Sequence, residues 1–366
     1  MTDKNWNEVL IDMIPKYYSA KNPTEYHLAM LETVSLIDDS HSNFIISKEI
    51  KKFFGEYYIP IKYYILDNKI LITAFNADEE GRKDDLRVGD AILEIDGVSV
   101  KELMQLYSKF IPASNAKGKA RRSFFLVTGH KKEALVKIER NGKFFEKTIH
   151  RCEVAKMKPA KHSNKKNIKW KKLNTNVAYV NLKHIKYKDT KQMLDSVTKC
   201  KAIVFDLRYG TRGTAVMGLI ALRLFPEKKV FAKIIAPDLT YPGKYYLTDE
   251  KNKGVKNKQF YKGKVLLLVD ERTQSHNEYF TMCLQQAPNA ITIGTQTAGA
   301  DGNISVFDLC GGFRTTMTGT GIFYPDGTVT QRKGVKIDIN VEPTIEGIKE
   351  GRDEILEKAI QLLNAK

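Results

Sequence analysis

Short apolar segments alternate with helical patterns through the second half of the chain. Four of these segments are rich in Val, Ile and Leu, and each is long enough for one buried strand: residues 176–182, 201–207, 264–270 and 290–294. Apolar positions recur at helical spacing in the segments between them, residues 188–200, 214–225 and 277–287. Strands that are joined through helices pair in parallel and are covered by those helices. The pattern therefore predicts an α/β core over residues 173–366.

Three further parts precede this core. Residues 1–55 carry apolar side chains at helical spacing and predict helices, the second of which ends near Asp38. Residues 56–153 carry β-branched and aromatic runs and predict a β-rich domain, which closes with a hairpin at Asn141-Gly142 because both turn residues tolerate a positive φ. Residues 154–172 are rich in lysine and predict a solvated linker.

The net charge of +17, from 60 Lys and Arg against 43 Asp and Glu, bears on the class of partner. A charge of this size favours nucleic acid or a membrane surface where it is focused on one face, and here the lysines are scattered along the sequence. The linker lacks the interleaved aromatic side chains that stack on bases, so we expect no nucleic-acid partner. No segment approaches the ~18 apolar residues of a membrane span, and Met1 to Trp6 lack the apolar stretch of a secretory signal.

Cysteines and short motifs limit the cofactor chemistry. The four cysteines lie far apart, at Cys152, Cys200, Cys283 and Cys310. Without a CxxC pair they do not indicate a zinc ribbon, a redox motif or a dense disulfide framework, and we expect buried free thiols. The chain also has no P-loop, GxGxxG or HExxH motif and no cluster of metal ligands. We therefore expect neither a cofactor nor a metal ion.

Ser275 lies where the apolar segment 264–270 meets a helix that is expected to begin at His276. A hydroxyl on such a turn is exposed at the carboxyl end of a strand, beside helix N–H groups that stabilise negative charge. Nucleophilic serines are presented in this way. Serine is also the common N-cap residue of a helix, and the local pattern alone favours that interpretation.

A nucleophilic serine needs a base, and position singles out His41 among the seven histidines. His41 follows a helix end in a polar turn, where no packing role explains it, although a surface loop histidine fits the pattern equally well. His276 adjoins Ser275, but neighbouring side chains point apart, so we expect His276 to contribute its backbone N–H. Residues 205–213 end a strand in a glycine-containing turn. Two interpretations stay open: the turn presents its amides to a ligand, or it is a structural loop between strand and helix. His162, in the linker, is expected to be solvated.

Several segments, in order along nearly the whole chain, resemble those of a known peptidase family. Residues 86–100, LRVGDAILEIDGVSV, are similar to the recurrent segment of PDZ domains. Four later segments resemble the successive blocks of the C-terminal processing (tail-specific) serine peptidases: residues 201–213, 269–278, 293–303 and 321–344. The resemblance implies an N-terminal helical segment, an inserted PDZ domain and an α/β core of the crotonase and Clp-protease type.

Matched residue by residue, Ser275 takes the position of the family's nucleophile, three residues before Glu278. The lysine base of one branch would fall at Ala300 and is missing. The branch that includes the tricorn core uses histidine, and His41 in LIDDSHSNF matches its D-G-H-[ST] segment with serine in place of glycine. The third residue of that branch, a glutamate, is matched by Gln331, which can hold an imidazole by a hydrogen bond but supplies no charge.

The glycine turn of the family is also altered here, and the resemblance implies an oxyanion hole formed by the amides of Gly213 and His276. The implied function is a serine endopeptidase that cleaves unfolded or C-terminal protein segments, after the PDZ groove has captured an extended peptide by strand addition. Its partners are polypeptides. The resemblance also implies export to a periplasm or outer surface, with any membrane anchor lost by truncation.

Two alternatives to the peptidase stay open at this point. The departures at Ala300, Gln331 and the glycine turn are compatible with a catalytically degenerate homologue that binds peptides without cutting them. The net charge is compatible with a nucleic-acid binder, whose affinity would fall steeply with salt. The oligomeric state and the natural substrate are not indicated by any segment.

Overall fold

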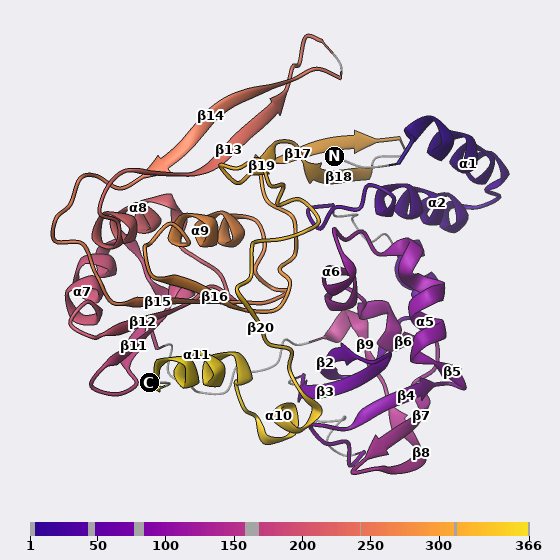
Figure 1. Ribbon diagram of the computed structural model, residues 1–366. Coiled ribbons are helices and arrows are strands. Elements are labelled where there is room, and N and C mark those ends of the chain that lie inside the picture. The colour runs from indigo at the N-terminus through magenta and orange to yellow at the C-terminus, as the bar shows by residue number, and fades with distance from the viewer. Residues whose placement is uncertain are drawn as a thin grey trace.

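The chain folds into a helical segment, a β-rich domain and an α/β core, which the computed structural model places side by side (Figure 1). The structure describes residues 4–42, 48–76, 84–157, 168–241, 243–310 and 313–364. Most of the expected linker, including His162, lies outside these residues. None of the described helices is long and apolar enough to cross a membrane.

The N-terminal segment is helical. Its helices are α1 (Trp6–Ser19), α2 (Pro23–Ser35) and α3 (Lys48–Phe54). Asn22 caps α2, because its side-chain oxygen accepts the N–H of Glu25 at 3.0 Å. The helical spacing predicted an end near Asp38, but α2 ends at Ser35, and Asp38 has a positive φ of 53°. The chain then turns away from the helix axis and carries His41 toward the core.

The β-rich domain is built on an antiparallel sheet in the order β2-β3-β4-β7-β8. Its strands are β2 (Ile61–Leu66), β3 (Lys69–Phe75), β4 (Ala91–Ile95), β7 (Glu133–Arg140) and β8 (Lys143–His150), and β5 (Val98–Ser99) pairs with β4. A smaller sheet joins β6 (Thr128–Gly129), β1 (Tyr57–Tyr58) and β9 (Cys152–Glu153). The predicted hairpin is confirmed, since Arg140 pairs with Lys143 and the turn residues Asn141 and Gly142 have φ of 53° and 74°.

Short helices complete this domain and the connections around it. The α-helices are α5 (Val100–Tyr107) and α6 (Ala116–Arg121). Single 3-10 turns span Ser108–Phe110, Phe124–Val127, Val154–Lys156 and, in the core, Leu182–His184. Helix α6 lies between the domain sheet and the core, and its last turn reaches the site described below.

A six-stranded sheet forms the centre of the α/β core, in the order β10-β11-β12-β15-β16-β20. Its strands are β10 (Trp170–Lys172), β11 (Val177–Asn181), β12 (Ala202–Asp206), β15 (Lys264–Val269), β16 (Ala290–Gly294) and β20 (Ile339–Asn340). All neighbours pair in parallel except β10 with β11. Residues 170–172 were expected in the linker; they instead form an edge strand, because Trp170 packs on the core.

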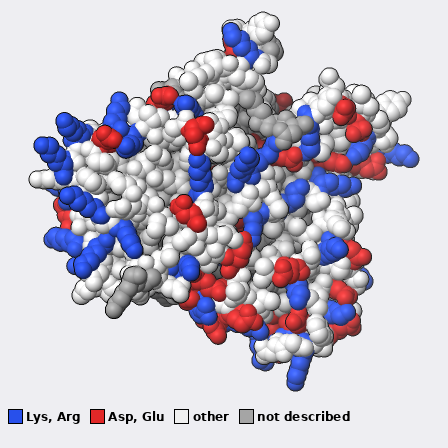
Figure 2. Space-filling model, viewed as in Figure 1, with Lys and Arg blue, Asp and Glu red and all other residues white. Residues whose placement is uncertain are grey.

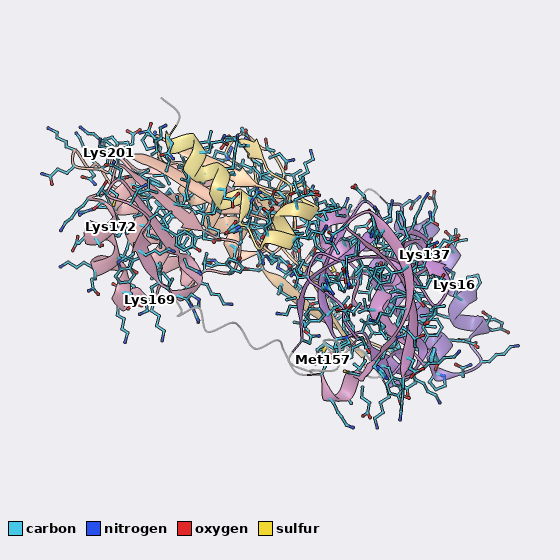
Figure 3. All side chains as sticks on the ribbon, turned by 90° about the horizontal axis from the view of Figure 1, so that it is seen from below. Lys16, Lys137, Met157, Lys169, Lys172 and Lys201 are labelled. Carbon is cyan, nitrogen blue, oxygen red and sulfur yellow. The ribbon has the colours of Figure 1, made fainter. Side chains whose placement is uncertain are left out.

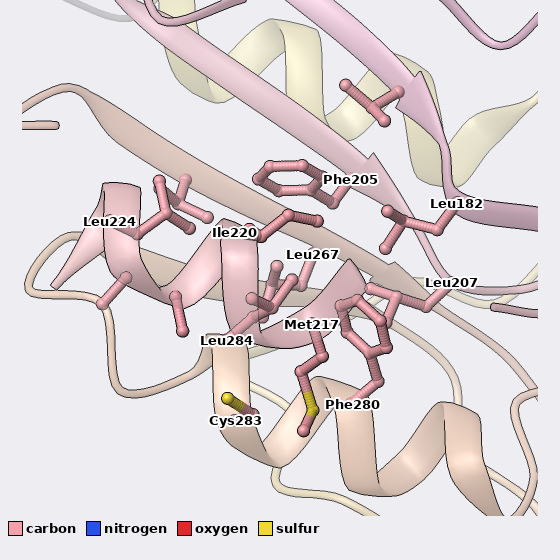
Figure 4. Packing of buried hydrophobic residues seen from close by; sticks show 14 of the residues in the cluster. Leu182, Phe205, Leu207, Met217, Ile220, Leu224, Leu267, Phe280, Cys283 and Leu284 are labelled. Atoms are coloured by element: carbon pink, nitrogen blue, oxygen red, sulfur yellow. The ribbon is translucent and has the colours of Figure 1, made fainter. Parts of the chain in front are cut away.

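Helices cover both faces of this sheet. Along β12, Ile203 and Phe205 face one cluster of buried side chains while Ala202 and Val204 face another, as the two-residue period of a strand requires. The first cluster is covered by α7 (Tyr187–Val197), α8 (Gly213–Leu224) and α9 (His276–Leu284). Figure 4 shows Ile220 of α8 beside Phe205, and Phe280 of α9 near Leu207 and Met217. The second cluster is covered by α11 (Glu354–Asn364). The predicted α/β core is confirmed.

Two hairpins and one short helix extend from the core. The long arm of β13 (Lys229–Pro237) and β14 (Tyr245–Lys253) projects from the body (Figure 1), and β19 (Gly321–Phe323) pairs with the middle of β13. The hairpin of β17 (Ile304–Leu309) and β18 (Phe313–Thr318) lies beside the N-terminal helices. Helix α10 spans Ile345–Glu350.

The cysteines are free thiols. Three of them are buried: Cys152, Cys200 and Cys283. Cys310 follows β17 and is exposed, which the expectation of buried thiols missed. An exposed cysteine between two strands has no sequence signal that separates it from a buried one.

Candidate active site

The turn between β15 and α9 holds Ser275 in a strained backbone conformation. Its φ and ψ are 58° and −125°, a region that non-glycine residues rarely enter and that costs about 1–3 kcal/mol. The prediction that α9 begins at His276 is confirmed. The first turn of the helix is closed by the Ser275 carbonyl oxygen, which accepts the N–H of Glu278 at 2.8 Å, and not by the hydroxyl. The N-cap interpretation therefore does not account for this side chain.

Glu278 is the group that holds this strained turn. Its carboxylate is fully buried and accepts four hydrogen bonds, from the Thr297 hydroxyl at 2.6 Å and from the N–H groups of Gly299 (2.8 Å), Ala300 (3.0 Å) and Ser275 (3.1 Å). Burial raises the pKa of Glu278, and the four donors act in the opposite direction. The N–H of Ser275 also reaches the carbonyl oxygen of Ala300 at 2.8 Å. The position matched to the family's lysine thus lies directly against the serine backbone.

Replacing Glu278 with alanine is expected to lower the free energy of unfolding by several kcal/mol. The N–H groups of Gly299 and Ala300 and the Thr297 hydroxyl lose their acceptor, and each unsatisfied group costs about 1–3 kcal/mol. The N–H of Ser275 keeps the carbonyl oxygen of Ala300. Urea unfolding of the variant measures this loss, with Glu146→Ala on the exposed surface of β8 as the control. A loss no larger than that of the control would show that Glu278 does not hold the turn.

His41 is almost fully buried, with 4% of its surface exposed. Its Nδ1 atom lies 2.8 Å from the Oγ1 atom of Thr318 on β18, and its carbonyl oxygen accepts the hydroxyl of Thr316 at 2.6 Å. Its Nε2 atom is buried and has no hydrogen-bond partner among the described residues. Burial lowers the pKa of His41, Asp39 acts to raise it, and Arg122 lowers it further. The lowered pKa favours the neutral form of the imidazole.

Asp39 ties the histidine turn to β18. One of its carboxylate oxygens accepts the N–H of His41 at 2.9 Å and the side-chain amide of Gln331 at 3.3 Å, and the other accepts the N–H of Thr318. The expectation that Gln331 holds the imidazole is wrong, because its amide contacts Asp39 and the Nδ1 atom of His41 contacts Thr318. The Oε1 atom of Gln331 is buried without a partner among the described residues.

The segments that carry His41 and Ser275 meet, although 234 positions separate them. The side-chain amide of Gln274 donates to the carbonyl oxygen of Ser40 at 3.0 Å, so the residue before the serine contacts the residue before the histidine. Arg122, at the end of α6, donates to the Ser40 carbonyl at 2.5 Å and holds the same turn from the side of the β-rich domain. Because Nε2 of His41 has no partner, the bond from the Ser275 hydroxyl to this atom is not made here; unliganded sites often leave such bonds open.

The altered glycine turn lies against the start of α9. The hydroxyl of Thr211 donates to the side-chain oxygen of Asn277 at 2.8 Å. The His276 imidazole contacts the backbone of Gly213; burial lowers the pKa of His276, and this contact acts to raise it. The described residues supply no acceptor for the N–H groups of Gly213 and His276. The oxyanion hole at these two amides stays a prediction.

Sequence reasoning missed Asp39 and Thr318. Asp39 stands within the matched segment LIDDSHSNF, so its spacing of two residues from His41 was the available signal. Thr318 lies 277 positions from His41 and has no motif of its own. In the part of the chain that the structure describes, no group of three acidic, histidine or cysteine side chains is placed to hold a metal ion.

One protein family and several solved structures match the chain. Residues 176–341 match the model of peptidase family S41. No curated protein matches. The structure of mature CPAF in complex with lactacystin has a TM-score of 0.73 at 14% identity, over 98% of this chain and 92% of that chain. A second structure of mature CPAF has a TM-score of 0.70 at 14% sequence identity, over 98% of this chain and 91% of that chain. The structure of a candidate peptidase from Parabacteroides merdae has a TM-score of 0.59 at 16% sequence identity, over 100% of this chain and 91% of that chain. These likenesses extend the shared fold beyond the core to nearly the whole chain.

Proposed function

Because the core of this chain belongs to peptidase family S41, a family of serine peptidases, we propose that the protein is a serine endopeptidase with Ser275 as its nucleophile and His41 as its base. The observation that carries the proposal is the meeting of two distant turns. The strained serine and the buried histidine with an unpartnered Nε2 lie on segments joined by the bond from Gln274 to Ser40. An N-cap serine and a surface histidine would need neither feature.

In the proposed reaction, Nε2 of His41 takes the proton of the Ser275 hydroxyl while Oγ attacks the carbonyl carbon of the scissile peptide bond. The oxygen of the resulting tetrahedral intermediate accepts hydrogen bonds from the amides of Gly213 and His276. The imidazolium of His41 then gives its proton to the leaving nitrogen as the C–N bond breaks. Water repeats these steps on the acyl ester and restores the serine.

The Nδ1 side of His41 needs an acceptor for its own proton, and we propose Thr318 for this role. Its hydroxyl lies 2.8 Å from Nδ1, and its backbone N–H is held by the Asp39 carboxylate. Asp39 also supplies a buried negative charge that favours the imidazolium, which Gln331 cannot do. Thr318 is thus a positioning residue, and Asp39 takes the electrostatic part that the family assigns to its glutamate.

Replacing Thr318 with valine is expected to lower kcat by roughly 10- to 100-fold with little change in KM, since a hydrogen bond to a charged group contributes about 1.5–3 kcal/mol. Without this acceptor the imidazolium is less stable, so the pKa of His41 falls further. A histidine base is active when neutral, so the acid limb of kcat/KM moves to lower pH. Thr318→Ser, which keeps the hydroxyl, is the matched control. Equal losses in both variants, or an unmoved acid limb, would contradict this role.

Substrate capture is assigned to the β-rich domain. Its sheet ends in the strands β2 and β8, and an extended peptide can add to a free strand edge through backbone hydrogen bonds. The same domain reaches the site through Arg121, which donates to the side chain of Gln274 at 2.8 Å, and through Arg122. We propose that unfolded or C-terminal protein segments bind in this way, as the resemblance to PDZ domains implies, and that the protein is exported.

The proposal is tested by incubating the full chain with an unfolded protein and following new N-termini. Cleavage that is lost on chemical blocking of serine supports it. Binding without new N-termini would support a catalytically degenerate homologue that binds peptides without cutting them. The altered residues Ala300 and Gln331 would then explain the loss of activity.

A further inference from the structure

Several lysines that lie far apart in the sequence gather at one end of the folded core. Figure 2 shows Lys and Arg side chains crowded over the end that carries α7 and α8, whereas both signs of charge mix over the β-rich domain. Figure 3 shows Lys172 and Lys201 at this outer end from below. The expectation that the charge is not focused is therefore wrong for this part of the surface, which we term the basic end.

Two adjoining shallow hollows form the basic end, with volumes of about 640 and 580 Å³, and Phe260 lines both. Their cationic side chains are Lys201, Arg223 and Lys262 in the first hollow and Lys228, Lys256 and Lys258 in the second. Among the described residues of both linings, the one carboxylate is Glu227, which pairs with Lys229 at 2.6 Å. The hollows therefore carry a clear excess of positive charge.

These cations are poorly compensated within the protein. Arg223 contacts Asp195 at 3.3 Å, but none of the five lysines pairs with a carboxylate of a described residue. Like charges held together repel each other, and an anionic surface that binds them relieves the repulsion. An uncompensated cluster of this kind indicates a negatively charged partner.

The loop that carries most of these lysines is fixed in position. The backbone N–H of Asn257 donates to the carbonyl oxygen of Pro226 at 2.8 Å, and the side-chain amide of Asn257 donates to the carbonyl oxygen of Leu222 at 3.0 Å. Farther along, the N–H of Tyr261 donates to the carbonyl oxygen of Arg223 at 2.8 Å. The charges are thus presented by a preformed surface rather than by a loose tail.

Apolar side chains stand among the lysines. Val255 is 54% exposed and Leu222 is 40% exposed, and the ring of Phe260 is half-buried between the hollows. Lysine stems and small apolar groups suit the headgroup layer of a membrane. Nucleic-acid surfaces add arginine forks and stacked aromatic rings to their lysine contacts with phosphate, whereas the cations here are nearly all lysines.

The basic end and the candidate active site lie at opposite edges of the same sheet. Lys264 begins β15, and the turn that carries Ser275 follows the other end of that strand. A surface bound at the amino ends of the strands therefore leaves the site open to substrate.

We propose that the basic end binds the anionic phospholipid headgroups of a membrane surface and holds the protein there with its active site facing away. This proposal rests on the charge and shape of the basic end and does not depend on the peptidase function. At low salt, each lysine near an anionic membrane surface raises the partition coefficient of a protein onto that membrane by roughly fivefold.

The test is cosedimentation of the full chain with phosphatidylcholine vesicles, with and without phosphatidylglycerol. We expect salt-sensitive binding to the vesicles that contain phosphatidylglycerol and none to phosphatidylcholine alone. The triple variant Lys228→Gln, Lys256→Gln, Lys258→Gln is expected to lose roughly a hundredfold in partition. The matched control, which removes the same charge from the β-rich domain, combines Lys101→Gln, Lys131→Gln and Lys143→Gln.

Circular dichroism confirms that both variants fold. Equal partition of the two triple variants would overturn the proposal, because net charge and not the basic end would then govern binding. Failure of the unchanged protein to sediment with phosphatidylglycerol would also overturn it. Saturable binding to an RNA homopolymer without binding to vesicles would assign the surface to nucleic acid instead.

Discussion

Replacing Ser275 with alanine is expected to lower kcat for a peptide substrate by roughly 10⁴- to 10⁶-fold, because the atom that forms the acyl bond is gone. The change removes one hydroxyl that makes no capping bond, so the free energy of unfolding should stay close to that of the unchanged protein. Affinity for the peptide should also persist, since the β-rich domain is unaltered. Initial rates at saturating peptide, with binding measured separately, check both parts.

Ser19→Ala, at the exposed end of α1, is the matched control for this substitution. It removes a serine hydroxyl far from the site and should leave the rate unchanged. If the Ser275 variant still cleaved at the rate of this control, the observed cleavage would belong to another residue or to a contaminant.

Replacing His41 with alanine is expected to cause a comparable loss, roughly 10⁴- to 10⁶-fold in kcat, because the proposed acceptor of the serine proton is removed. The double variant with Ser275→Ala should be no worse than either single variant, since residues that act as one unit lose their effect together. Because His41 is buried, alanine also leaves a cavity, so His41→Gln is measured beside it.

His130→Ala removes an exposed histidine and serves as the control. Losses in the Ser275 and His41 variants that multiply in the double variant would mean that the two residues act independently. The proposed proton transfer would then be wrong.

The fold and the serine turn were predictable because their signals are local. The strand over 264–269 and the helix from His276 both show in the hydrophobic period, and the turn between them is short enough to place Ser275. Asn141-Gly142 likewise defines its hairpin within four residues. In each case neighbouring residues in the chain are also neighbours in space.

The contacts around His41 were not predictable, because they depend on how distant elements pack. Thr318 reaches the imidazole only because the hairpin of β17 and β18 folds back over the N-terminal turn. Gln331 was matched by its place in a family segment, which says nothing of its rotamer, and its amide contacts Asp39 instead.

The grouping of the lysines was also not predictable, because it depends on how distant segments pack. Lys201 and Lys262 lie in separate loops and share one hollow only after folding. The strand β10 was hidden because Trp170 is the one large apolar side chain among its three residues, which end a lysine-rich stretch. The scatter of the lysines along the sequence therefore did not predict where they lie on the surface of the folded protein.

The most direct test of the central claim is covalent labelling with a fluorophosphonate, which reacts with an activated serine hydroxyl, followed by mass spectrometry of the digested protein. We predict a single phosphonylated residue, Ser275, and loss of the label in His41→Ala, because the hydroxyl is then no longer activated. A protein that resists the reagent while folded, or that carries the label on another serine, would contradict the proposed pairing of Ser275 with His41.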